Sequence, residues 1–335
     1  MCTNFKVPVA KDGTVVVGRS LEFPTLMPTA LSVLPSNYAG SAVLPDGFSK
    51  SKQWTARFGI VGMAAFGHAE WLLDGMNTEG LSAHLLYMPR FAQYATPAGD
   101  GADVSQVDVI AFILGTCANL DEAKAALAEI RIWGFDPGMG FPPPIHVLMH
   151  DKSGSLAVEF RPEGTSVVDN PTSVATNAPF LDWHLGNLAN FAGMSASSDL
   201  STVYGSATFT SLGQGAGLRG LPGDYTAPSR FVRAFTMLAL ADQPADSRDA
   251  EQFALHMLNA FDIPSGLIKE EGPGGALVDE VTVWDTIANL TQRRFAYRTI
   301  SDPTVYVVNL DDVDFAAPAR TKDLSWSGDF TPVTV

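Results

Sequence analysis

Short apolar runs bounded by glycine, proline or charged residues recur along the chain and predict β-strands. The first two runs, 4–10 and 14–19, are separated by Lys11-Asp12-Gly13, and Asp-Gly between two such runs is typical of a β-hairpin. A glycine-bounded turn in 74–87 leads into a further strand that ends at Tyr87. More strands are predicted at 30–34, 58–64, 145–150, 156–160, 165–168, 173–176, 281–289, 293–297 and 305–309.

Apolar residues at helical spacing predict helices that come in two pairs. Asn119, followed by Glu122, gives one of them a start that resembles a capping box. Because the helices are paired rather than alternating singly with strands, their order disfavours a doubly wound parallel sheet and favours antiparallel sheets covered by helical layers. The predicted helices span 104–114, 119–130, 228–240 and 248–261.

Composition and charge narrow the class of protein. The 335 residues contain no Pro/Ser-rich linker and no charge run, so we expect a single domain over 2–335. The net charge of −15, with only 21 Lys and Arg residues, argues against nucleic acid and anionic membranes as partners. No apolar run is long enough to span a membrane, and Lys6, Lys11 and Asp12 interrupt any signal-peptide core. We therefore expect a cytoplasmic protein without a leader.

The start Met1-Cys2-Thr3 points to a catalytic thiol. Removal of Met1 would place a thiol and a free α-amino group on Cys2, so that a nucleophile and its general base share one residue, as in N-terminal nucleophile amidases. Many proteins begin Met-Cys without such a role, and that alternative stays open. The other thiol, Cys117, lies in an apolar helical stretch and is expected to be buried and inert.

The predicted first hairpin would bring charged residues to this thiol. A turn near residue 12 pairs positions whose numbers add up to about 24 or 25, so we expect Glu22 to lie opposite Cys2 or Thr3. In that arrangement Arg19 would favour the thiolate of Cys2, and Glu22 would hold the α-ammonium group. The alternative is an ion pair at the surface end of a strand.

Other motifs in the sequence give weaker evidence for a catalytic or binding site. Residues 215–220 match a dinucleotide-binding fingerprint letter by letter, but Pro222 and Pro228 stand where its long helix must begin. His146 and His150 lie four apart on a predicted strand, and no third ligand accompanies them. No nucleophile elbow and no phosphate-binding Gly-Lys-Ser/Thr motif occurs. We therefore expect neither a metal nor an organic cofactor.

Five short motifs, taken in order, resemble the choloylglycine hydrolase family, which holds bile salt hydrolases and penicillin V acylases. The resemblance runs from residue 2 to about residue 310 and implies an α+β fold, the four-layer αββα sandwich of N-terminal nucleophile hydrolases, with two antiparallel sheets between helical layers. It also implies a homotetramer. The motifs are Cys2-Thr3, residues 18–23, residues 74–81, residues 176–180, and residues 221–225 with Ser229-Arg230-Phe231.

The resemblance also implies roles for particular residues. The family's nucleophile falls on Cys2, its arginine partner on Arg19, its oxyanion-hole asparagine on Asn177 and its second arginine on Arg230. The acidic residue that contacts the α-amino group is typically Asp, and this chain has Glu22 there.

The expected reaction is hydrolysis of a linear amide. The thiolate of Cys2 attacks the carbonyl carbon, its own α-amino group relays the proton to the leaving amine, and water hydrolyses the thioester. Asn177, with a backbone N–H near Tyr87, would hold the oxyanion. Bile salt hydrolases carry Asn where this chain has Tyr87, and many penicillin V acylases carry an aromatic residue, so Tyr87 favours the acylases.

The expected substrate is a small amide with a bulky apolar acyl group, such as penicillin V or an N-acyl-homoserine lactone. One alternative is a bile salt hydrolase that removes glycine or taurine from bile acids. The other is a non-catalytic binding relative, for which Glu22 is the only hint. Candidate residues of the acyl pocket are Phe23, Leu26, Met27, Met63, Phe66 and the loop 133–144, which includes Phe141 and either rims the pocket or packs on the core.

Overall fold

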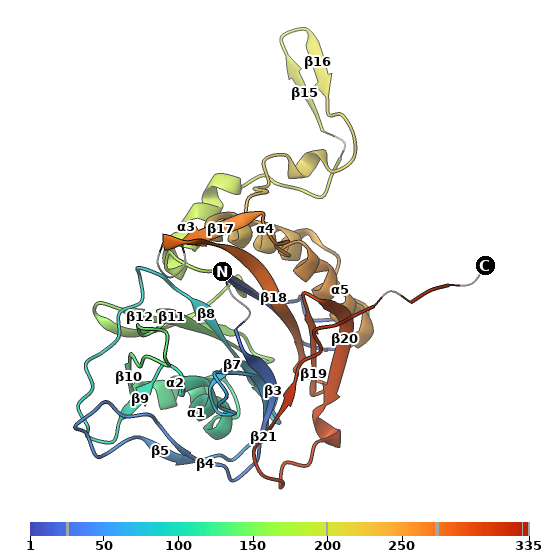
Figure 1. The fold of residues 1–335 in the computed structure, drawn as a ribbon. Helices are drawn as coiled ribbons and strands as arrows, with labels where there is room; N and C mark the ends of the chain where they lie inside the picture. Colours follow the sequence, from blue (N-terminus) through green and yellow to red (C-terminus); the bar gives the residue numbers. More distant parts are fainter. Residues whose placement is uncertain (25–26, 199, 272–274, 330, 334–335) are drawn as a thin grey trace.

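The computed structural model describes residues 1–335 except 25–26, 199, 272–274, 330 and 334–335. Two antiparallel sheets lie face to face between helices (Figure 1). The first sheet contains, in order, β14 (Val174–Ala175), β1 (Cys2–Lys6), β2 (Val16–Phe23), β18 (Leu277–Asn289), β19 (Arg294–Thr299) and β20 (Asp302–Asn309), with β17 (Ile268–Glu271) paired to β18. The second contains β13 (Gly164–Asp169), β12 (Ser155–Arg161), β11 (Ile145–His150), β8 (Ser82–Tyr87), β7 (Leu72–Asn77), β6 (Ile60–Ala65), β3 (Thr29–Leu34) and β21 (Arg320–Asp323).

Helices cover the outer face of each sheet. Helix α1 (Val109–Thr116) packs on β7 and β8, and α2 (Leu120–Ala128) shares an apolar core with it. On the other side, α5 (Ser247–Asn259) packs on β2 and β18, and α4 (Ala227–Leu240) packs on β1 and β14. The molecule is therefore the predicted α+β sandwich, with the order helix, sheet, sheet, helix.

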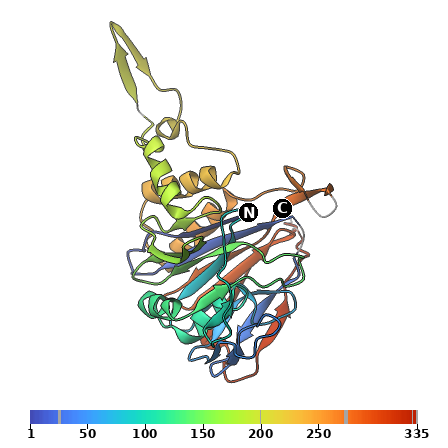
Figure 2. The ribbon, with the colours of Figure 1, turned by 90° about the vertical axis from the view of Figure 1, so that its left-hand side faces the viewer.

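Several smaller elements lie outside the two main sheets and the helices that cover them. They are β4 (Ala39–Ser41) with β5 (Gln53–Thr55), the parallel pair β9 (Asp103–Ser105) and β10 (Arg131–Trp133), α3 (Leu181–Asn187), and the hairpin of β15 (Ser201–Tyr204) and β16 (Ala207–Thr210). Figure 2 shows that this hairpin projects away from the sandwich. No helix among the described residues is long and apolar enough to cross a bilayer.

The first hairpin is confirmed, but its predicted register is wrong. Cys2 pairs with Leu21, so the residue numbers of paired positions in the two strands add up to 23. Glu22 therefore lies opposite Met1, rather than opposite Cys2 or Thr3 as predicted. Near the turn, Ala10 pairs with Thr14, whose numbers add up to 24. One extra residue therefore lies on the outgoing arm, around Pro8, which has no N–H to give to the ladder.

One predicted helix is shorter than expected, because pairing with a distant segment overrides the local pattern. The helix expected over 104–114 begins at Val109, since Asp103–Ser105 pair with Arg131–Trp133 as strands. The glycine-bounded turn predicted within 74–87 and the strand that ends at Tyr87 are confirmed: 74–77 belong to β7, the turn follows at 78–79, and β8 ends at Tyr87. The start of α2 is confirmed: the side chain of Asn119 accepts a hydrogen bond from the backbone N–H of Glu122 at 3.0 Å.

Candidate active site

Cys2 begins β1, and its side chain is buried between the two sheets. Arg19 lies two positions before Leu21, the partner of Cys2, so the pleat of β2 turns Arg19 to the same face as the thiol. Its Nη2 lies 3.6 Å from Sγ of Cys2. A cation at this distance stabilises the thiolate form, which is the nucleophilic one.

The guanidinium of Arg19 is fixed on several sides and fully buried. Nη2 donates to the carbonyl of Leu85 at 2.7 Å, and the group lies 4.4 Å from the ring centroid of Trp284. Its Nε lies 3.7 Å from Oδ2 of Asp74. Because a buried cation needs a counter-charge, Asp74 compensates Arg19.

Asp74, to which the sequence analysis assigned no role, is the buried counter-charge of Arg19. Besides Arg19, its carboxylate lies 3.1 Å from Nδ1 of His84 and accepts a hydrogen bond from Thr286 at 2.9 Å. The available signal was a carboxylate within the apolar run 72–76, which a buried strand tolerates only with a partner. The contacts that hold Arg19 therefore extend into the second sheet.

Asn177 follows β14 and reaches the other side of Cys2. Its Oδ1 accepts from the backbone N–H of Cys2 at 3.0 Å and from Nη2 of Arg230 at 2.5 Å. Its Nδ2 donates to the carbonyl of Tyr87 at 2.6 Å. Arg230, on α4, also donates to the carbonyl of Cys2 at 2.5 Å and to the hydroxyl of Thr3 at 2.9 Å. These contacts fix the amide orientation of Asn177.

Glu22 lies at the expected end of β2 but makes a different contact. Its backbone N–H donates to the carbonyl of Met1 at 2.9 Å, and its carbonyl accepts from the α-ammonium group of Met1 at 2.7 Å. The carboxylate that holds this ammonium group is instead that of Glu280. Burial raises the pKa of the Glu22 carboxyl, while the charge of Arg230 acts in the opposite direction.

An apolar cavity opens beside the thiol. Of the predicted pocket residues, Phe23, Met27, Phe66 and Tyr87 line it. Phe141 is 44% exposed and lies outside the lining formed by the described residues. The full lining is Cys2, Arg19, Leu21, Glu22, Phe23, Met27, Phe66, Trp71, Leu72, Leu73, Leu85, Tyr87, Gln106, Val107, Met139, Pro143 and Ile145.

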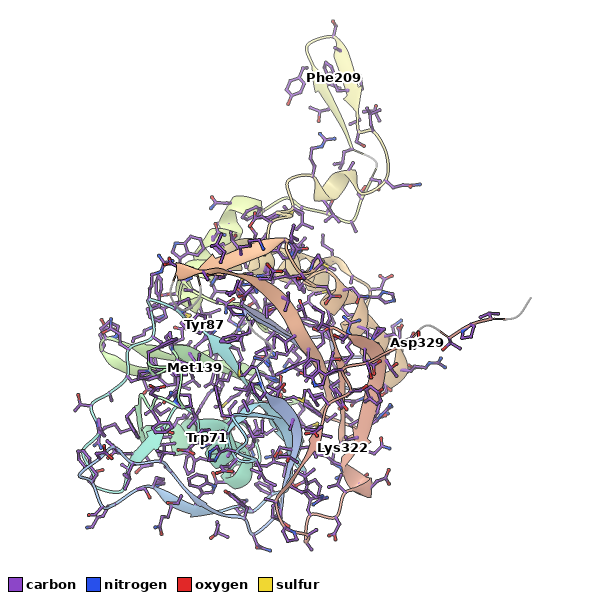
Figure 3. The ribbon with its side chains drawn as sticks, in the orientation of Figure 1. Trp71, Tyr87, Met139, Phe209, Lys322 and Asp329 are labelled. Atoms are coloured by element: carbon purple, nitrogen blue, oxygen red, sulfur yellow. The ribbon has the colours of Figure 1, made fainter. Side chains whose placement is uncertain are left out.

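The other residues predicted for the acyl pocket are confirmed only in part. Met63 belongs to the buried core rather than to the lining, and Leu26 lies outside the described residues. Met139 and Pro143 line the cavity, so the predicted loop 133–144 rims it, although Phe141 is not part of the lining. Figure 3 shows three lining residues, Trp71, Tyr87 and Met139, on one side of the sandwich. Trp71 carried no periodic signal in the sequence because it lies outside the strands, between a turn at 69–70 and the start of β7.

The competing motifs have structural explanations. Residues 216–218 form a short 3₁₀ helix after Gly215, away from any strand-to-helix crossover. Nε2 of His146 donates to the carbonyl of Thr176 at 3.0 Å, and burial lowers the pKa of this histidine to about 4. Among the described residues, no group of three metal-binding side chains is present. Cys117 is buried as predicted, and burial raises the pKa of its thiol.

Known proteins resemble this chain over most of its length. Residues 2–325 match the family described as linear amide C-N hydrolases, choloylglycine hydrolase family. A bile salt hydrolase/transferase of Clostridium perfringens (strain 13 / Type A) is 31% identical over 77% of this chain and 78% of its own. A crystal structure of a conjugated bile acid hydrolase variant from Clostridium perfringens has a TM-score of 0.87 and 25% identity, with 99% of this chain and 100% of that chain covered. A penicillin V acylase structure from Agrobacterium tumefaciens matches in fold, with a TM-score of 0.76 and 21% identity over 97% of this chain and 92% of that chain.

Proposed function

Because the chain belongs to the choloylglycine hydrolase family and is a hydrolase of carbon–nitrogen bonds in linear amides, we propose that Cys2 is its nucleophile. The observation that carries the proposal is the convergence of Arg19 and Asn177 on Cys2, beside the apolar cavity that Cys2 and Arg19 line. Arg19 Nη2 lies 3.6 Å from the thiol sulfur, and Asn177 Oδ1 lies 3.0 Å from the backbone nitrogen of Cys2. Thiol and cation thus lie at the cavity that an acyl group can enter.

The reaction requires that Met1 be removed. With Met1 attached, the nitrogen of Cys2 is an amide that donates to Asn177 and cannot act as a base. Once it is free, the α-amine takes the thiol proton while Sγ attacks the carbonyl carbon. The amine then gives that proton to the leaving nitrogen as the C–N bond breaks. Water hydrolyses the thioester by the reverse proton transfer, which restores the thiol.

The surrounding residues receive supporting roles in this proposal. Nδ2 of Asn177 and a backbone N–H near Tyr87 stabilise the oxyanion, which develops only in the transition state. Arg230 fixes Asn177 and the carbonyl of Cys2. After Met1 is removed, the carboxylate of Glu22 is expected to approach the new α-ammonium group from the neighbouring strand.

The substrate in this proposal carries a bulky apolar acyl group. Phe23, Met27, Phe66 and Tyr87 line the cavity, which suits phenoxyacetyl, fatty acyl or steroid acyl groups. Tyr87 supports penicillin V or an N-acyl-homoserine lactone. The second candidate is a conjugated bile acid, because the bile salt hydrolase relative and the bile acid hydrolase structure are more similar to this chain than the acylase structure is.

We also propose an oligomeric state, a domain organisation and a cellular location for the protein. The homotetramer is supported by the projecting hairpin, on which Tyr204 is 71% exposed and Phe209 is 60% exposed. A single domain is supported by the pairing of β21, near the end of the chain, with β3 near its start. A cytoplasmic location remains the prediction made from the sequence.

The test is an intact mass before and after thiol alkylation, together with hydrolysis of penicillin V, a long-chain acyl-homoserine lactone and glycine-conjugated cholate. We expect a mass without Met1, alkylation at Cys2 and loss of turnover in parallel with it. The Cys117→Ser variant is the matched control and should keep full activity. Retained Met1 with turnover that alkylation does not change would overturn the proposal.

A further inference from the structure

Two buried histidines, His146 and His184, contact the backbone at Asn177, and the reaction above gives neither of them a role. His146 is on β11 and is 4% exposed, and His184 is on α3 and is 3% exposed. Nε2 of His146 lies 3.0 Å from the carbonyl oxygen of Thr176, and Nε2 of His184 lies 2.9 Å from that of Asn177. Two imidazoles from different elements thus contact two successive carbonyls.

The two histidines are neutral hydrogen-bond donors. A carbonyl oxygen can only accept a hydrogen bond, so Nε2 of each ring carries the proton. Burial lowers the pKa of His146 and of His184 to about 4, which keeps both rings neutral at pH 7. A neutral imidazole protonated on Nε2 donates from that nitrogen alone. The single hydrogen bond that each ring can donate therefore goes to the backbone.

These two hydrogen bonds hold the peptide units on both sides of the Asn177 Cα. The carbonyl of Thr176 belongs to the peptide unit that precedes this Cα, and the carbonyl of Asn177 belongs to the unit that follows it. Because a peptide unit is planar, holding both units restricts both φ and ψ of Asn177. These two angles set the direction of its Cα–Cβ bond and hence the position of the side-chain amide at Cys2.

A ring contact connects this backbone to the helix that holds the Asn177 side chain. The ring of His184 stacks on that of Phe231 on α4, with centroids 4.6 Å apart and planes 12° apart. Arg230, the residue before Phe231, donates to Oδ1 of Asn177 at 2.5 Å. Asn177 is thus held through its backbone by His184 and through its side chain by Arg230, and the stacked rings join the two contacts.

We propose that His146 and His184 are positioning residues that hold the backbone of Asn177, so that its side-chain amide meets the oxyanion formed at Cys2. A donor stabilises an oxyanion only within a narrow range of distance and direction. A small displacement of Asn177 therefore slows the chemical step more than it weakens binding. The inference rests on the proposed amidase function and adds two residues that act through Asn177.

The test removes the donor of His184 and keeps a ring. His184→Phe retains an aromatic side chain beside Phe231 but cannot donate to the carbonyl of Asn177. For the amide that wild type hydrolyses fastest, we expect kcat to fall by about tenfold or more and KM to change by less than about threefold. His184→Gln keeps a donor and should recover most of the rate. Alkylation of Cys2 forms no oxyanion and should proceed at the wild-type rate in both variants.

A double-mutant cycle identifies the residue through which His184 acts. In the Asn177→Ala background the side-chain amide is absent, so adding His184→Phe should change kcat by less than about threefold. His150→Phe is the matched control, because His150 is also a buried histidine but is hydrogen-bonded to Asn4 and Ser155. Its effect on kcat should be the same factor with and without Asn177→Ala. Every variant is measured as protein whose intact mass lacks Met1.

The tautomer of each histidine gives a test in the unaltered protein. The ¹⁵N chemical shifts of His146 and His184 at pH 7 should show neutral rings protonated on Nε2. A neutral ring protonated on Nδ1 could not donate to its carbonyl and would contradict the inference, whether or not the variants fold.

The kinetic outcomes separate this inference from the function on which it rests. A wild-type kcat in His184→Phe, or an equal loss of kcat with and without the Asn177 amide, would overturn the inference and leave the amidase function standing. Slower alkylation of Cys2 in parallel with hydrolysis would also overturn it, since His184 would then support the whole site. An effect of His150→Phe that disappears in the Asn177→Ala background would do the same, because the coupling would not be particular to His184. No hydrolysis of any amide by wild-type protein lacking Met1 would remove both the inference and the proposed function.

Discussion

Nη2 of Arg19 lies 3.6 Å from Sγ of Cys2, and the same nitrogen donates to the carbonyl of Leu85 in the opposite sheet at 2.7 Å. One guanidinium thus links the thiol on β1 to β8 across the interface between the sheets. Because Arg19 is fully buried, it cannot swing away from the sulfur without losing these contacts. The position of the cation beside the thiol is therefore built into the sheet packing.

Replacing Arg19 should slow reactions of the thiol. In Arg19→Gln the thiolate loses its neighbouring cation, so we expect alkylation of Cys2 at pH 7 to slow by about tenfold or more and hydrolysis to fall with it. Arg19→Lys keeps the charge and should recover part of both rates. Arg57→Gln, at an exposed arginine, is the control. Equal alkylation rates in Arg19→Gln and wild type would contradict this role.

Removing the amide of Asn177 should reduce turnover more than binding. We expect Asn177→Ala to lower kcat by about 10²- to 10³-fold, the usual effect of losing one oxyanion donor. Alkylation of Cys2 should continue at a comparable rate, because it forms no oxyanion. Asn187→Ala, on α3, serves as the control for amide loss elsewhere. A change confined to KM would instead assign Asn177 to ground-state binding.

Stability should decrease as the pH falls from about 6.5 to about 4. Burial lowers the pKa of His146 from 6.5 to about 4, so the unfolded chain takes up a proton in this range while the folded chain does not. The stabilisation from neutral His146 is present above pH 6.5 and is lost as the pH falls through 4. This loss corresponds to about 3 kcal/mol in the free energy of unfolding.

Urea unfolding at pH 7 and pH 4 measures this effect in wild type and in His146→Gln. The amide of Gln can still donate to the carbonyl of Thr176 but does not titrate. The variant should therefore lose less stability than wild type over the same range. His68→Gln, at a partly exposed histidine, should behave like wild type. Identical pH dependence in all three proteins would show that His146 does not contribute.

The projecting hairpin should hold the proposed tetramer together. Val203, Tyr204 and Phe209 are exposed on it, with Phe209 close to its tip (Figure 3). In the double variant Tyr204→Ser and Phe209→Ser, we expect the mass measured by light scattering to fall below that of wild type. Val168→Ser changes an exposed apolar residue of β13 and should leave the mass unchanged. A wild-type monomer at micromolar concentration would contradict the proposal.

Local patterns in the sequence were sufficient for most regular elements. The Asp-Gly turn, the Asn119 cap and the apolar faces of α4 and α5 each depend on residues within one or two turns of each other. Two of the strands that were missed depend on distant partners instead. Strand β9 exists because 103–105 pair with 131–133, and β21 because 320–323 pair with β3.

The same distinction between local patterns and distant contacts applies to the residues of the candidate site. The sequence alone determined which residues can carry the chemistry: a thiol that becomes N-terminal when Met1 is removed, an arginine on the return strand and an asparagine at a strand end. The tertiary structure decided where they lie, including the register that places Glu22 opposite Met1 and the contacts of Asp74 and Glu280. The physical reason is that the periodicity of apolar residues shows only which face of a strand or helix is buried. The register between two strands, and the contact between Met1 and Glu280 across 279 residues, depend on how the sheets and helices pack together.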